Sequence, residues 1–103
     1  MSVVVVATVV PVPEHRAELI EALEQTITAV QSDDQGCELY ALHEGEDRLV
    51  MIEKWTTAEA LATHGQGAAL QALNRAFAGK LASEPDVQVL HPHPAGTAEQ
   101  GTL

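Results

Sequence analysis

Three side chains capable of acid–base or aromatic chemistry lie in the stretch GCELYALHEGEDRLVMIEKWTTAEALATH, which runs from Gly36 to His64. His64 carries an imidazole, the side chain that most readily takes up a proton near neutral pH. Tyr40 has a hydroxyl that can donate to a bound oxygen atom, and Trp55 has an aromatic face and an indole N–H. These residue types would suit removal of a proton from an aromatic hydroxyl and stabilisation of the anion that forms.

Each of these side chains also fits a structural role. A histidine on a helix flank is often solvated, a tyrosine in an amphipathic strand often keeps its hydroxyl in water, and a tryptophan at a strand end often packs in the core. Glu53 shares a strand face with Trp55, so we expect it to be partly buried. For Glu53 a structural salt bridge to an arginine is favoured over acid–base work.

Four further residues are candidates for the wall of a pocket. Thr8 is the polar interruption in an otherwise apolar first strand, and it is predicted to face the pocket. Met51, Leu73 and Phe77 would supply apolar walls. Core packing explains the same three residues equally well.

The elements that must position these residues follow from periodicity. Two features shape the second helix: Thr56 with Glu59 fits a capping box, and the glycines of Gly65–Gly67 each cost about 1 kcal/mol relative to alanine. We therefore expect a second helix in two pieces with a bend. The predicted elements, in chain order, are a strand at Val3–Val10, a helix over 13–31, strands at Cys37–His43 and Arg48–Trp55, the bent helix, and a strand at Asp86–His91.

This β-α-β-β-α-β order predicts the α+β ferredoxin-like fold, an antiparallel sheet with its helices on one face. One domain would span residues 1–91, followed by a flexible tail over residues 92–103 that has little to bury. In the third strand Leu49, Met51 and Trp55 point one way, while Val50 and Ile52 point the other. Because a monomer rarely exposes a broad apolar sheet face, we expect a homodimer packed sheet to sheet.

Composition excludes several classes of partner. The net charge is −10 and the five Lys and Arg residues are scattered, so no basic patch exists for nucleic acid or an anionic membrane. The apolar amino terminus lacks a positive n-region and ends well short of a membrane span of roughly 20 residues. These observations predict a cytoplasmic protein. His91 and His93 have no third ligand nearby, so we expect no metal site there.

The same stretch resembles the antibiotic biosynthesis monooxygenase (ABM) domain, of the small quinol monooxygenase type. The residues that carry the resemblance are Gly36-Cys37, Tyr40, Glu46-Asp47, Glu53, Trp55, Ala60-Leu61 and His64. The resemblance implies a dimeric α+β barrel with a pocket between sheet and helices. It also implies oxidation of phenolic or quinol-like compounds by O₂ with no metal, flavin or haem. The stretch Gly65–Leu70 departs from the family by lacking a second histidine, which argues against a two-histidine mechanism.

The leading functional hypothesis is therefore a cofactor-independent monooxygenase acting on a quinol or polyphenol, with His64 as base and Tyr40 and Trp55 contacting the substrate. An isomerase of a small carbonyl compound could use the same base. A third hypothesis is a non-catalytic dimeric module that binds a hydrophobic ligand.

Overall fold

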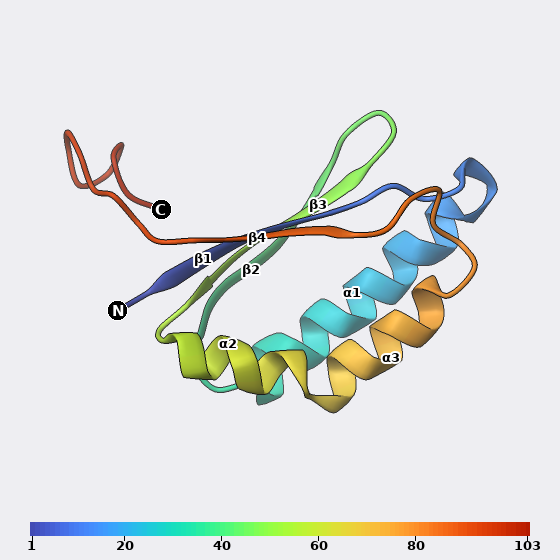
Figure 1. Cartoon of the computed structure of the whole chain (residues 1–103), viewed down its shortest axis with the longest axis horizontal. Helices are drawn as coiled ribbons and strands as arrows, with labels where there is room; N and C mark the ends of the chain where they lie inside the picture. Colours follow the sequence, from blue (N-terminus) through green and yellow to red (C-terminus); the bar gives the residue numbers. More distant parts are fainter.

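Four antiparallel strands form one sheet in the order β2-β3-β1-β4, with all helices against one face (Figure 1). The computed structural model describes the whole chain, residues 1–103. The elements are β1 (Val3–Val9), the short 3₁₀ helix η1 (Pro13–His15), α1 (Arg16–Asp33), β2 (Cys37–Glu44), β3 (Leu49–Trp55), α2 (Ala58–Gly65), α3 (Ala68–Phe77) and β4 (Asp86–Leu90). This order and this sheet confirm the predicted ferredoxin-like α+β fold.

The two central strands separate their residues cleanly between the two faces. Strand β1 pairs with β3 in antiparallel register, and Val5 lies opposite Glu53. Residues at alternate positions of β3, from Leu49 to Trp55, are buried beneath the helices, as predicted. The intervening residues of both strands, such as Val6 and Ile52, are only half-buried on the outer face. Strand β1 is thus covered by the helices on one face only, because nothing in a single chain packs across the other face.

Helix α1 covers the sheet with an apolar stripe. Leu19, Leu23 and Val30 recur at helical spacing and are buried, as the sequence predicts, while Ile20 and Ile27 at the edges of the stripe are half-buried. Thr26 joins the buried stripe because its hydroxyl donates to the Ala22 carbonyl at 3.0 Å, which satisfies the polar group.

The second helical region breaks where the glycines predict. Helix α2 ends at Gly65 and α3 begins at Ala68, so the two pieces turn around Gln66 and Gly67. The predicted cap is displaced by one residue. Thr57, and not Thr56, is the N-cap of α2, because its Oγ1 accepts from the Ala60 N–H at 3.0 Å.

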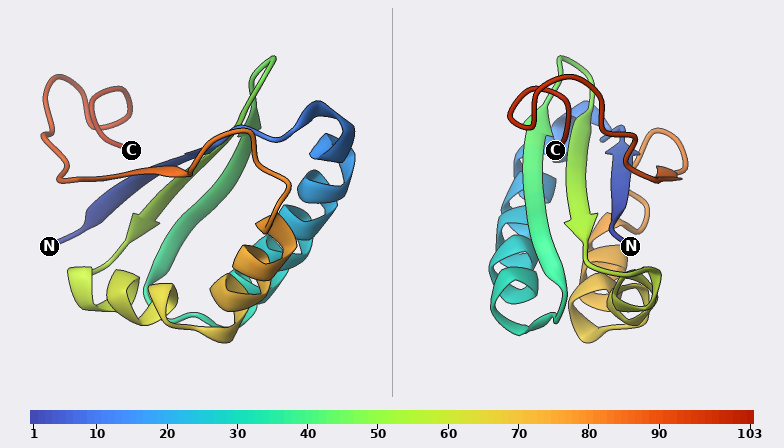
Figure 2. Two further views of the ribbon diagram at one scale, coloured as in Figure 1. Left: turned by 45° about the vertical axis from the view of Figure 1, so that its right-hand side comes forward. Right: turned by 90° about the vertical axis from the view of Figure 1, so that its left-hand side faces the viewer.

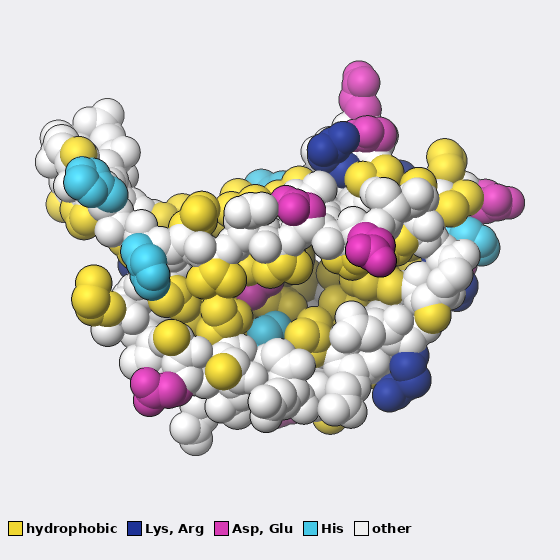
Figure 3. Space-filling model, in the orientation of Figure 1, with side chains coloured by type: hydrophobic (Ala, Val, Ile, Leu, Met, Phe, Trp, Pro, Cys, Tyr) yellow, Lys and Arg dark blue, Asp and Glu magenta, His cyan; other side chains and the backbone are white.

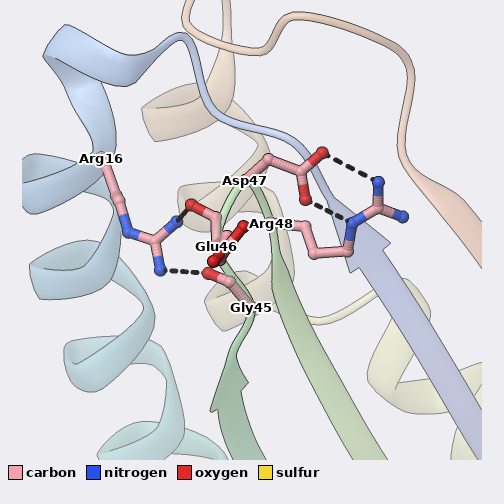
Figure 4. Close-up of polar contacts among 5 residues, drawn as sticks. All are labelled: Arg16, Gly45, Glu46, Asp47 and Arg48. Atoms are coloured by element: carbon pink, nitrogen blue, oxygen red, sulfur yellow. Dashed lines mark hydrogen bonds and ion pairs between the residues drawn. The ribbon is translucent and has the colours of Figure 1, made fainter.

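Arg16 at the start of α1 holds the turn between β2 and β3 (Figure 4). Its Nη2 donates to the Gly45 carbonyl at 2.8 Å and its Nη1 donates to the Glu46 carbonyl at 3.2 Å. By contrast, Arg48 pairs only with its neighbour Asp47, at 2.7 and 2.9 Å (Figure 4). Arg16 therefore links helix to hairpin, while Arg48 makes a local contact.

Strand β4 lies at the sheet edge, paired only with β1, and all its residues are exposed. Residues 92–103 contain neither helix nor strand and leave the end of β4 away from the helices (Figure 2). The Lys54 ammonium donates to the carbonyl of Leu103 at 2.9 Å, which links β3 to this tail. None of the helices combines the length and apolar character needed to cross a bilayer.

Candidate active site

A cavity of about 280 Å³ lies between the sheet and helices α1 and α3. Ten of its thirteen lining residues are apolar, and the other three are Tyr40, Glu53 and Asn74. Figure 3 shows the molecule hollowed between the sheet and the helices, with apolar side chains around the opening. The cavity suits a small, largely apolar molecule that carries a few polar groups.

The structure places three of the four predicted wall residues on this cavity. Met51 from β3 and Leu73 and Phe77 from α3 all line it. Thr8 does not, because Ala7 and Val9 on either side of it face the helices. Strand alternation then turns Thr8 to the outer face, which corrects the expectation that it lines the pocket.

His64 is buried in the last turn of α2, with 5% of its surface exposed. Its Nδ1 lies 2.7 Å from Oδ2 of Asp34, and its Nε2 lies 3.4 Å from the Tyr40 hydroxyl. A carboxylate accepts only, so Nδ1 carries the proton that Asp34 accepts. In the neutral imidazole, Nε2 is then the unprotonated nitrogen, and it is directed at Tyr40.

The close approach of α2 to the start of β2 depends on Gly36. This residue has φ of 81°, and a Cβ here would lie 2.7 Å from the Ala60 Cβ and from the Thr56 Oγ1. The Gly36 carbonyl also accepts from the Thr56 N–H at 2.9 Å. Gly36 thus lets α2 pack against the α1–β2 loop, which brings His64 next to Asp34.

Tyr40 connects His64 to the cavity. Its side chain lines the cavity and is itself only 3% exposed. Burial raises the pKa of Tyr40, and the nearby Glu53 carboxylate raises it further. The phenol therefore stays protonated and donates to the open nitrogen of His64. His64 is not among the residues that line the cavity, and the Tyr40 hydroxyl lies between its Nε2 and the cavity.

Trp55 lies behind this pair of residues. It is fully buried, its ring centroid is 4.6 Å from that of His64, and it does not line the cavity. Its indole Nε1 donates to Glu53 Oε1 at 3.0 Å. Trp55, which was predicted to contact a bound molecule, thus lies against the His64 ring and the Glu53 carboxylate and not among the residues that line the cavity.

Glu53 is buried, as expected, with 5% of its surface exposed. The prediction of a salt bridge to an arginine is wrong, because its partner is the neutral indole of Trp55. Burial raises the pKa of Glu53, opposed in part by the Trp55 hydrogen bond and by His64. Glu53 is thus a carboxyl group on the cavity wall with no cation beside it.

Asp34 is the residue of this group that sequence reasoning missed. It is the C-cap of α1, its backbone N–H bonds the Val30 carbonyl at 3.0 Å, and its side chain is 23% exposed. A carboxylate at a helix C-terminus opposes the helix dipole, so another interaction must favour it there. An acidic residue at this unfavourable position was the signal in the sequence from which a partner for Asp34 could have been predicted.

No three His, Cys, Asp or Glu side chains are grouped so that they could hold a metal ion. His91 and His93 are both exposed beyond β4. The single thiol, that of Cys37, is half-buried, and burial raises its pKa. The polar side chains that line the cavity are those of Tyr40, Glu53 and Asn74.

Comparison with known proteins agrees with this fold. The family model described as "Antibiotic biosynthesis monooxygenase" matches residues 2–76. The structure of Rv0793 from Mycobacterium tuberculosis is 26% identical, with TM-score 0.86, and the match covers 94% of this chain and 100% of that one. A Caulobacter crescentus protein whose name refers to the same family is 24% identical, with TM-score 0.82 and coverage of 86% and 87%. No curated protein matches the sequence. Because the family model spans well over half of the chain, this protein belongs to the antibiotic biosynthesis monooxygenase family.

Proposed function

We propose that this protein is a monooxygenase that oxidises a quinol or polyphenol with O₂ and needs no cofactor. The observation that carries the proposal is the hydroxyl of Tyr40, which lines an apolar cavity and contacts Nε2 of a buried His64. Through this pair of residues, a proton can leave an aromatic hydroxyl that is bound in the apolar cavity.

The first step is formation of the substrate anion. With an aromatic ring between Met51 and Phe77, a ring hydroxyl donates its proton to the Tyr40 oxygen while Tyr40 passes its own proton to Nε2 of His64. Asp34 then faces an imidazolium and stabilises its charge. Trp55 and Tyr40 hold the imidazole ring in place from two sides.

The second step is reaction with oxygen. The electron-rich anion passes one electron to O₂, and the radical pair recombines as a peroxide on a ring carbon. Loss of water then leaves a carbonyl, with one oxygen atom in the product and the other in water. For a hydroquinone the balance is hydroquinone plus O₂ giving hydroxyquinone plus water, so the substrate supplies all four electrons. A proton delivered through His64 and Tyr40 then protonates the departing hydroxide.

The proposal includes a homodimer that forms through the outer face of the sheet. Apolar side chains at alternate positions, among them Val4, Val6, Val50 and Ile52, lie on this face without a covering layer. Exposed apolar area of this kind favours a second copy. In sedimentation velocity we expect a dimer for the wild-type protein and a monomer for Val6→Glu. Ala62→Glu, on the exposed surface of α2, should remain dimeric.

A hydrophobic-ligand-binding module is the second candidate, favoured by the ten apolar lining residues and by the position of His64 off the wall. Isomerisation of a phosphorylated carbonyl compound is less well supported, because no Lys or Arg lines the cavity.

The deciding experiment follows one- and two-ring hydroquinones with an oxygen electrode, using ¹⁸O₂ and protein treated to remove metals and flavins. We expect oxygen uptake and one labelled atom per product molecule. Absence of uptake with every quinol, together with saturable binding of the same compounds, would instead establish the binding module.

A further inference from the structure

A second hollow lies on the other side of His64. It measures about 460 Å³ and is lined mainly by polar residues, including Asp33, Asp34, Thr57 and Glu59 as well as His64. The imidazole therefore separates two spaces. Its Nε2 faces Tyr40 and the apolar cavity, while its Nδ1 faces Asp34 at the polar hollow.

We infer that Asp34 is a positioning residue that fixes the His64 ring and passes protons between the buried site and solvent in the polar hollow. The inference rests on the proposed function, because it assigns the route by which the proton of the substrate hydroxyl leaves and returns.

Geometry supports each link of this route. The Nδ1 to Oδ2 distance of 2.7 Å is that of a charge-assisted hydrogen bond. The Asp34 side chain is 23% exposed while that of His64 is 4% exposed, so the carboxylate is the more accessible of the two to water in the polar hollow. Asp34 is thus the contact between a buried base and the solvent.

The groups around the His64 ring favour its positively charged form during proton transfer. Asp34 faces it from the end of α1, Glu53 lies near it from β3, and Tyr40 faces it as a neutral phenol from β2. Glu59 adds a further acidic group to the polar hollow, and no Lys or Arg lines that hollow.

The proton balance closes over one turnover. The proton that arrives at Nε2 makes an imidazolium, and the Nδ1 proton moves to the Asp34 carboxylate and then to water. The reverse sequence delivers a proton to the hydroxide that leaves the peroxide. No net proton is gained or lost by the protein.

The test compares Asp34→Ala, Asp34→Asn and Asp33→Ala in the oxygen-uptake assay with a hydroquinone. Asp33 lines the same hollow, but the carboxylate that bonds His64 is that of Asp34, so Asp33 is the matched control. We expect kcat to fall by about 100-fold in both Asp34 variants, with KM nearly unchanged, and to stay at the wild-type value in Asp33→Ala. Added formate should restore kcat in Asp34→Ala by supplying a carboxylate, and should do nothing for Asp34→Asn, where the amide fills the space.

Wild-type kcat in Asp34→Asn would overturn the inference, as would loss in Asp34→Ala that formate does not relieve in a protein with unchanged circular dichroism. If the wild-type protein consumes no oxygen, the proposed function fails instead. The positioning role is then read from ¹⁵N NMR of the His64 ring. We expect the proton on Nδ1 in the wild type and on Nε2 in Asp34→Asn, and an unchanged tautomer would overturn it.

Discussion

The two ends of the space between sheet and helices are filled differently. At the α2 end, Tyr40, Trp55 and His64 pack ring against ring with centroid distances from 4.6 to 6.2 Å. Every buried polar side-chain atom there has a partner. At the α3 end, Leu73 and Phe77 leave a cavity of about 280 Å³.

This difference separates two tasks within one layer. A filled, hydrogen-bonded end holds an imidazole and a carboxylate in fixed positions, which proton transfer requires. A hollow end gives up packing to make room for a ligand. Tyr40 belongs to both ends, since it contacts His64 and also lines the cavity.

The largest effect is expected from removing the base at the filled end. His64→Ala should lower kcat by about 10²- to 10⁴-fold, the usual contribution of a general base. His43→Ala is the control, because His43 lies on β2 and does not line the cavity. Oxygen uptake measures both. Equal activity of the two variants would show that the filled end has only a structural role.

Filling the hollow end should act on binding. Leu73→Trp places a larger ring in the cavity, so we expect KM to rise by about tenfold or more, with a stability change within the roughly 1–3 kcal/mol typical of overpacking. Ala68→Trp adds the same ring to an exposed position of α3 and should leave KM unchanged. Michaelis curves and thermal melts distinguish the two. An unaltered KM in Leu73→Trp would place the substrate elsewhere.

Glu53 offers a smaller effect that appears as pH dependence. Its pKa is raised above the ordinary value of 4.5, so the folded state keeps a proton that the unfolded state has lost. The free energy of unfolding should therefore fall as pH rises from about 4.5 through the folded-state pKa. In Glu53→Gln this contribution is absent, so the variant should gain stability relative to wild type as pH rises. Thermal melts across that range test it, and parallel curves would contradict it.

The sequence predicted the hollow end better than the filled end. Periodicity predicted that Met51, Leu73 and Phe77 face the space between sheet and helices. The low helix propensity of Gly65 and Gly67 predicted the break between α2 and α3. The sequence prediction placed Thr8 on the wrong face of the sheet. A run of valines has no alternation of apolar and polar residues to show which of them face the helices.

The contacts of the filled end depend on the path of the chain. Asp34 meets His64 across 30 residues, through a turn that only Gly36 permits. The hydrogen bond between Trp55 and Glu53 could not be predicted, because it depends on the side-chain rotamers of both residues. Periodicity reports the face on which a side chain lies, and it does not report its partner.

The smallest expected effect concerns the frame around the hollow end. Arg16 binds two carbonyls of the hairpin turn just before Leu49, a residue of the cavity wall. Arg16→Ala should lower the free energy of unfolding by about 1–2 kcal/mol, because these two hydrogen bonds and a third to Glu44 Oε1 are lost at a partly exposed site. Arg48→Ala should leave it nearly unchanged, since an exposed ion pair between sequence neighbours contributes little to stability. Urea melts of both variants give the comparison. If both lose the same stability, the turn is held by its own residues and helix α1 does not frame the cavity through Arg16.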